Sequence, residues 1–395
     1  MAAHLHRPAD GGARRARAGD FAGPRATAVS APHPHPEHAE HIEHPKHAEH
    51  AKHIEHIEHI EHAEKGTFMP LLLSRSDLSR LAADDDELDG AIDAVEKSAV
   101  QCATGDRAQI TFTGLDLANG DELAAQFVSL ASGPATLRLF PNRVQGERPN
   151  AWLGMQLDGT TGAVDSMIAL DDFNVLRTSV PAAVGVRHLA PAGAATLTVL
   201  GSGAQARSHV RTIRRVMPGL RHLKLWSPTP GSRTAFGAEL RAQLGDGIRV
   251  TVADTIDDAV DGADVITAAG RYSHGEVAVP DPGSVRPGAL LISMTGAGGN
   301  LLERGARLAV PTARRPELVA FGFASGFIGD TPPPPPVGAL ELADVIAGKV
   351  PARGSHTDTI VFELAAPYQW DVPILAWIRA WADQRGLGTA FDFSG

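Results

Sequence analysis

The chain has 395 residues, a formal net charge of −10, 43% hydrophobic residues and 21% charged residues. This composition is typical of a globular protein of one large or two average domains, and its acidic balance argues against nucleic acid as a partner, since phosphate binding needs a basic surface. The single cysteine, Cys102, excludes an internal disulfide, and the chain shows no apolar run of the roughly 18 residues that span a membrane, so we expect a cytoplasmic protein.

The first 68 residues differ from the rest of the chain. Thirteen of the 18 histidines lie there, and they recur at every third position from His38 to His62. The segment has too little apolar bulk to offset chain entropy, which predicts a disordered tail, with metal binding by imidazoles as the alternative. In a third interpretation Met69 is the true initiator, and residues 1–68 are not translated.

Residues 69–190 alternate short apolar runs with turn residues, which predicts an α+β region. An Asp-Gly turn at Asp158 predicts a hairpin between the last two strands. Pro181 limits where the helix after this hairpin begins. The expected elements are strands at 71–73, 110–112, 136–140, 151–157 and 163–170, a cap and helix after residue 73, and helices at 84–99 and 176–189.

From Ala195 the pattern changes to alternating strands and helices, which predicts βαβ units and a parallel sheet. The proline run that ends at Pro336 interrupts this pattern. We expect strands at 196–200, 223–227, 249–252, 265–269 and 289–294, helices at 204–216, 234–244 and 256–260, and helices at 340–347 and 373–385 after the proline run.

A glycine-rich turn follows the first of these strands and opens the next helix. This position fits a dinucleotide site, because glycines permit a tight turn and let a pyrophosphate approach the free N–H groups of the helix. The alternative is a purely structural turn. The predicted cofactor-binding residues of the turn are Gly201, Ser202, Gly203, Ala204, Gln205 and Ala206, and Met294 joins them after a later strand.

The second strand of this region ends without the acidic residue that usually holds the ribose hydroxyl of NAD. Ser227, Thr229 and Arg233 follow it instead. Hydroxyls and an arginine suit a 2′-phosphate, so the sequence favours NADP over NAD. Alternatively, Arg233 is only a solvated residue in the first turn of the next helix.

Several segments together resemble the ornithine cyclodeaminase/mu-crystallin family across residues 69–389. The resemblance to this family is carried by the stretch Leu-Arg177-Thr178-Ser, by the glycine turn, and by the segments that begin at Thr161, Gly262, Arg286 and Gly386. The stretch from Val180 to Ala190 also resembles the actinobacterial tyramine oxidase branch of this family.

This resemblance implies an α/β fold in which a Rossmann-type parallel sheet domain is inserted in a second α+β domain built from both chain ends. It implies that residues 191–330 bind the dinucleotide, and that residues 69–190 with 331–395 form a substrate and dimerisation domain. The implied assembly is a homodimer. The family's activities are hydride transfers at carbons of amino-acid-like substrates, although the mu-crystallin branch mainly binds ligands.

The family's functional residues transfer to this chain only in part. By resemblance Arg177 orients a substrate carboxylate, Thr178 lies near the cofactor phosphates, and Arg107 falls near a second carboxylate-binding arginine; an ordinary salt bridge is the alternative for Arg177. The family lysine six residues before a Phe-Pro strand end is replaced by Ala135. Arg138 is nearby, but three residues place it on the other face of a strand.

The turn after residue 269 lacks the carboxylate that cyclodeaminases carry there, and a ring-closing deamination needs such a base. Ornithine cyclodeamination is therefore disfavoured, and Tyr272 or His274 are the candidates for proton transfer, although His274 would also suit a surface loop. We expect an NAD(P)-dependent oxidoreductase that acts on an imine or amine carbon, with no metal site. The alternative is a catalytically inactive cofactor-binding protein or accessory subunit of the same fold.

Overall fold

The computed structural model describes residues 69–83, 85–105, 108–118, 122–131, 133–142, 152–170, 173–269, 278–294, 296–311, 338–364 and 368–392. The predictions for residues 1–68, and those for Arg107, Tyr272 and His274, lie outside the described residues. Within the described part, no helix is long and apolar enough to cross a membrane.

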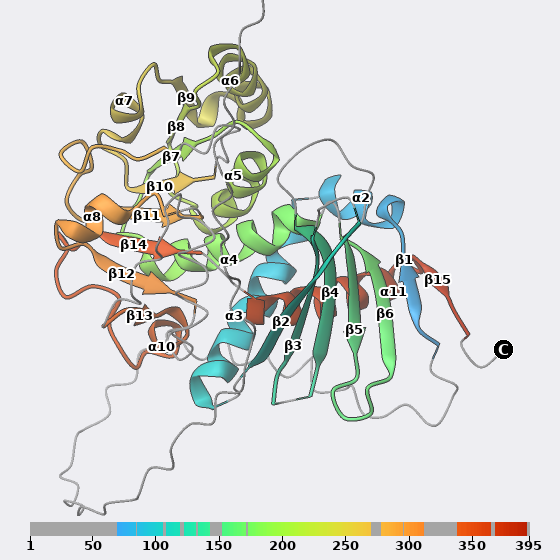
Figure 1. Ribbon diagram of the computed structural model, residues 1–395. Helices are drawn as coiled ribbons and strands as arrows, with labels where there is room; N and C mark the ends of the chain where they lie inside the picture. The colour runs from blue at the N-terminus through green and yellow to red at the C-terminus, as the bar shows by residue number, and fades with distance from the viewer. Residues whose placement is uncertain are drawn as a thin grey trace, which may run out of the picture. The chain divides into compact units, whose positions relative to one another are not determined.

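One sheet is built from residues near both ends of the described chain (Figure 1). The described residues form seven strands in it, and the pairings are antiparallel except that between its strands β1 and β6. The predicted hairpin at Asp158 is confirmed. In spatial order the strands are β15 (Thr389–Ala390), β1 (Leu71–Leu73), β6 (Val164–Ala169), β5 (Leu153–Leu157), β4 (Ala135–Asn142), β3 (Glu122–Ser129) and β2 (Gln109–Asp116).

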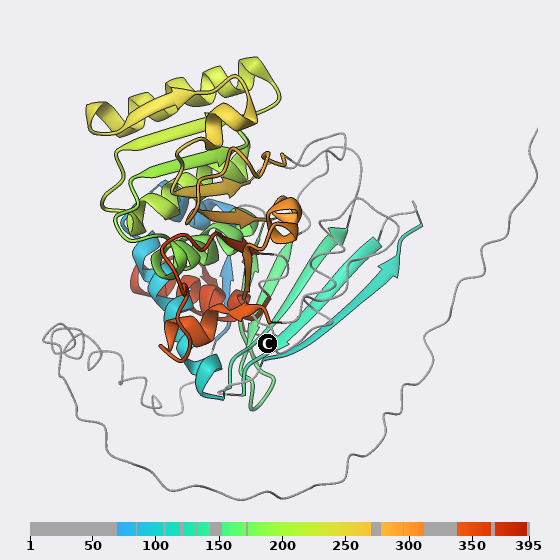
Figure 2. The same cartoon turned by 90° about the vertical axis from the view of Figure 1, so that its left-hand side faces the viewer.

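Helices α3 (Leu88–Thr104) and α11 (Asp371–Gln384) lie on one face of this sheet, as Figure 2 shows. Residues at helical spacing on α3, from Leu88 to Ala99, are buried, because an apolar stripe must face the core. The helix ends at Gly105, whose φ of 128° is unfavourable for other residues. The predicted helix at 84–99 therefore exists but begins and ends later. A shorter helix, α2 (Arg75–Ala83), follows β1 as expected.

The second sheet is parallel throughout, which confirms the predicted α/β class. Both faces are covered, with α5 and α6 on one side and α7 and α8 on the other, so its strands are apolar along their whole length. In spatial order its described strands are β13 (Leu340–Glu341), β12 (Arg307–Val310), β14 (Ile360–Glu363), β11 (Leu290–Ser293), β10 (Val265–Ala268), β7 (Thr196–Leu200), β8 (His222–Trp226) and β9 (Arg249–Val252). The helices are α5 (Ala204–Val216), α6 (Pro230–Leu244), α7 (Ile256–Val260) and α8 (Gly299–Glu303), with a short 3-10 turn, η1 (Gly245–Gly247).

Helix α4 (Phe173–Leu189) is mostly buried and packs against α3, α5 and β11. Its close approach to the parallel sheet requires Gly185, because a Cβ there would lie 2.4 Å from the ring of Phe362. The prediction that Pro181 limits the start of this helix is wrong, since Pro181 lies inside it. The proline removes one N–H, the one that would bond to the carbonyl of Arg177, and the surrounding packing compensates.

The strand order bears on the predicted domain division. Strands β13 and β14 belong to the parallel sheet, although the prediction from sequence grouped residues 331–395 with the other domain. The helix predicted at 340–347 is strand β13 followed by a shorter helix, α10 (Leu342–Ile346). The division into two domains stays a prediction, and these pairings place part of the C-terminal segment with the parallel sheet.

Candidate functional site

The glycine turn lies where β7 ends and α5 begins. Gly201 has a φ of 137°, and its N–H donates to the carbonyl of Trp226 at 2.7 Å, which ties the turn to β8. Gly203 is the N-cap of α5, and a Cβ built on it would meet nothing within 4 Å. Ala206 is fully buried against the sheet. The turn therefore has the open space and the exposed helix N-terminus that a pyrophosphate requires.

The residues predicted to meet the ribose gather at the end of β8. The hydroxyl of Ser202 donates to that of Ser227 at 3.0 Å, and Thr229 is the N-cap of α6. Arg233 lies in the first turn of α6, where its Nη2 is 3.0 Å from Oδ1 of Asp254. The Asp254 side chain is 91% exposed, so this ion pair is weak. Arg233 is thus a held residue rather than a merely solvated one.

A hydrogen-bonded link joins the glycine turn to α4. The Thr178 hydroxyl donates to Oε1 of Gln205 at 2.6 Å, and Nε2 of Gln205 donates to the carbonyl of Asn174 at 3.2 Å. Gln205 is the second residue of α5, so both its amide groups are used to fix α4 against the turn. Arg177 is thereby positioned one residue from the predicted cofactor site. Met294 lies separately, half-buried just after β11.

Arg177 forms a buried ion pair with Asp371, the first residue of α11. Its Nε and Nη2 donate to Oδ1 and Oδ2 at 2.9 and 3.2 Å, and the two residues are 7% and 2% exposed. Asp371 thus binds the side-on edge of the guanidinium in a bidentate manner. The salt bridge that the sequence left open as the alternative is present. It uses one of the two edges through which a guanidinium binds a carboxylate in this manner.

Arg138 joins this ion pair, which sequence reasoning did not foresee. Its Nη1 lies 3.7 Å from Oδ2 of Asp371, and its Nη2 donates to Oε1 of Gln126 on the neighbouring strand. The strand alternation does separate Arg138 from Ala135, as expected. However, the face that carries Arg138 is the one that contacts Asp371. The signal in the sequence was a lone arginine within an apolar strand.

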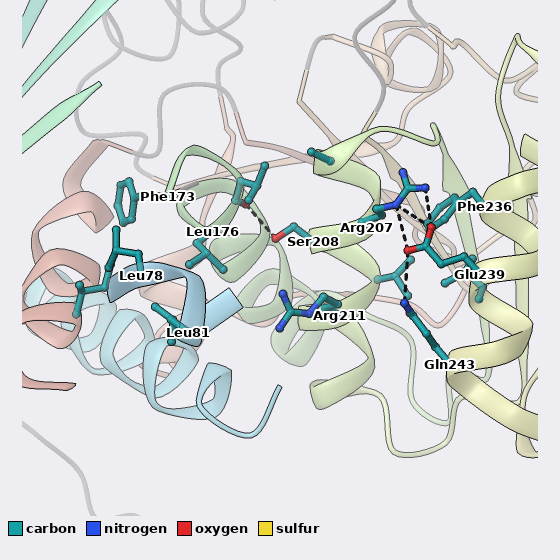
Figure 3. Close-up of a pocket in the computed structure, with 15 residues that line it drawn as sticks. Leu78, Leu81, Phe173, Leu176, Arg207, Ser208, Arg211, Phe236, Glu239 and Gln243 are labelled. Carbon is teal, nitrogen blue, oxygen red and sulfur yellow. Dashed lines mark hydrogen bonds and ion pairs between the residues drawn. The ribbon is translucent and has the colours of Figure 1, made fainter. Parts of the chain in front are cut away.

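A cavity of about 270 Å³ lies elsewhere, between α2, α4, α5 and α6 (Figure 3). Its walls are mainly apolar, with an ion pair between Arg207 and Glu239 at one end. Of the predicted site residues, it is lined by Ala204 alone. We therefore do not assign the predicted substrate site to this cavity.

Behind the glycine turn, α5 carries a fully buried histidine. Nδ1 of His209 lies 2.7 Å from the hydroxyl of Thr267 on β10. Among the described residues, its Nε2 has no hydrogen-bond partner. Burial lowers the pKa of His209 to about 3, so the imidazole is neutral in the folded protein.

The parallel sheet, the glycine turn and the helix that follows it define a protein of the Rossmann-type class. The sequence model of the ornithine cyclodeaminase/mu-crystallin family matches residues 151–378, more than half of the chain. The chain therefore belongs to the ornithine cyclodeaminase/mu-crystallin family, as its motifs predict. The narrower resemblance to the tyramine oxidase branch stays a prediction.

Individual relatives are distant. The chain is 23% identical to the ornithine cyclodeaminase of Brucella abortus over 249 residues, which are 60% of this chain and 65% of that protein. It is 24% identical to the delta(1)-pyrroline-2-carboxylate reductase of Bacillus cereus, over 71% of this chain and 88% of that protein. An archaeal alanine dehydrogenase dimer with bound NAD matches 82% of this chain and 99% of its own, with a TM-score of 0.64 and 18% identity. The match thus spans just under two thirds of the Brucella relative, and the structural likeness confirms the fold.

Proposed function

We propose that the protein is an NAD(P)-dependent oxidoreductase that transfers hydride at an imine or amine carbon of an amino-acid-like substrate. The observation that carries this proposal is the link from the glycine turn through Gln205 and Thr178 to Arg177. It places a guanidinium suited to a carboxylate beside a turn suited to a pyrophosphate. The name of the Bacillus cereus relative, a reductase of a cyclic imine with a carboxylate, supports the same chemistry.

The nicotinamide cofactor, when bound, supplies or accepts the hydride. Gly201, Gly203 and the first N–H groups of α5 would hold its pyrophosphate, and Ser227, Thr229 and Arg233 would surround its ribose. Arg177 would orient the substrate carboxylate so that the imine carbon faces the nicotinamide. Tyr272 and His274 remain the predicted residues for proton transfer.

The test is an absorbance assay of nicotinamide oxidation with a panel of cyclic imine carboxylates, 2-oxoacids with an amine, and ornithine. We expect turnover of an imine carboxylate and none of ornithine. Tight cofactor binding without turnover across the panel would instead support the second candidate, a non-catalytic cofactor-binding protein or accessory subunit. Ala135 favours this second candidate, because it has no ionisable group where the family carries a lysine.

We further propose NADP as the preferred cofactor. The exposed Asp254 is a weak competitor, so a 2′-phosphate can replace it as the partner of Arg233. Calorimetric titration should give tighter binding of NADP⁺ than of NAD⁺, and Arg233→Gln should weaken only the NADP⁺ complex, by about tenfold. Equal affinities in the unchanged protein would remove the preference.

We also propose a homodimer that forms through the face of the seven-stranded sheet opposite α11. Strand register aligns an apolar row across five strands of this face, and its members are half-buried or, for Phe127, 44% exposed. The row consists of Leu72, Met167, Met155, Leu137 and Phe127. An apolar row of this extent is typical of a buried interface. Light scattering should show a dimer, and Phe127→Glu with Met155→Glu should yield a folded monomer.

A further inference from the structure

Two guanidinium groups meet at one carboxylate oxygen in the described core. Nη2 of Arg177 and Nη1 of Arg138 lie 3.2 and 3.7 Å from Oδ2 of Asp371. They come from α4 and β4, which are far apart in sequence, so the tertiary fold brings them together. Paired guanidiniums with planar donor edges suit the recognition of a carboxylate.

Gln126 adds a buried hydrogen-bond donor to the same place. Its side chain is on β3, directly opposite Arg138 in the strand register, and it is 1% exposed. Its Oε1 accepts from Arg138, whereas its Nε2 has no hydrogen-bond partner among the described residues. A buried amide donor without a partner is costly, which indicates that another acceptor occupies this position in the functional state.

The Arg138 side chain is also fixed in orientation. Its guanidinium lies over the ring of Phe140, 4.4 Å from the centroid, and Phe140 stacks on Trp152 at 5.1 Å. Such stacking holds the plane of the guanidinium, so little side-chain entropy is lost when a ligand binds. The arrangement is therefore preorganised rather than adaptable.

We propose that Arg138 and Gln126 bind the substrate carboxylate together with Arg177, in place of the lysine that Ala135 replaces. This inference rests on the proposed function, because Arg177 is the residue that connects the cluster to the glycine turn. Asp371 is the anchor that holds both arginines at the correct positions. The site selects substrates that carry a carboxylate next to the reacting imine or amine carbon.

The experiment compares ligands that differ only in the carboxylate, on the full chain loaded with NADP⁺ or NADPH. Binding of L-proline and pyrrolidine is measured by calorimetry, and turnover of pyrroline-2-carboxylate and pyrroline is measured by absorbance. Arg138→Met should weaken binding of L-proline and raise KM for pyrroline-2-carboxylate by about 10- to 100-fold, with little change for pyrrolidine and pyrroline or for cofactor affinity.

Gln126→Glu is the variant that protects the test against misfolding, because it keeps the shape of the side chain and a contact to Arg138. It replaces the amide donor by a negative oxygen, so L-proline binding should fall by about tenfold or more. Arg385→Met is the matched control: Arg385 also lies over an aromatic ring, that of Trp381, and pairs with an acid, Glu87, and its loss should leave ligand binding unchanged.

The outcomes separate the two proposals. If Arg177→Met weakens L-proline binding while Arg138→Met and Gln126→Glu do not, the assignment of Arg138 is wrong and the proposed function stands. If L-proline binding depends on Arg138 but no imine is reduced, the carboxylate site stands and the proposed function fails. If the unchanged protein binds none of the carboxylate ligands, both are overturned.

Discussion

The buried imidazole of His209 makes the stability of this protein dependent on acid. In the unfolded chain a histidine titrates near its ordinary pKa of 6.5, whereas burial lowers the folded-state pKa of His209 to about 3. Between these two values the unfolded state binds a proton that the folded state rejects. The free energy of unfolding therefore decreases as the pH falls through this range, and the contribution is fully present only above the unfolded pKa.

The magnitude follows from the two pKa values. At about pH 5 the imidazole of the unfolded chain is mostly protonated, and the loss is about 2 kcal/mol relative to neutral pH. The test variant is His209→Asn, because its amide can keep the hydrogen bond to Thr267 without titrating. Urea unfolding of both proteins at about pH 7.5 and pH 5 gives the free energies of unfolding.

We expect the free energy of unfolding to fall by about 2 kcal/mol more in the unchanged protein than in His209→Asn. The variant's own stability at neutral pH does not matter, since only the difference between the two pH values is compared. His356→Asn removes an exposed histidine and is the control, which should behave like the unchanged protein. An identical pH dependence in the unchanged protein and His209→Asn would refute a buried, neutral imidazole at this position.

Three substitutions test other features of the structure. Gly203→Ala adds a methyl group to open space, so melting should be unaffected while the dissociation constant of the cofactor rises by about tenfold or more; an unchanged constant would contradict a pyrophosphate at this turn. Asp371→Asn leaves buried guanidinium charge without its partner and should lower the free energy of unfolding by about 3 kcal/mol or more in denaturant titrations, and a loss near zero would show that the pair is not buried. Gly185→Ala brings a methyl group against Phe362 and should cost about 1–3 kcal/mol by the same measurement; a neutral effect would mean that α4 and the sheet are further apart.

The sequence by itself determined the parallel sheet and its glycine turn. The predicted elements 196–200, 204–216, 249–252 and 256–260 have the bounds that the structure shows. They were predictable because buried parallel strands are continuous apolar runs, amphipathic helices repeat every 3.6 residues, and glycine marks a turn that other residues cannot adopt. These signals are local, so they need no knowledge of the rest of the chain.

The tertiary structure alone decided how the substrate side of the site is assembled. Arg177 was recognised from a motif, but its contact with Asp371 joins residues separated by 194 positions. Arg138 was set aside because strand alternation separates it from Ala135, and that alternation is correct. Alternation identifies two faces but not which face meets α11, because packing between distant elements makes that choice. A buried charge can be interpreted only when its partner is known, and here the partner comes from the other end of the chain.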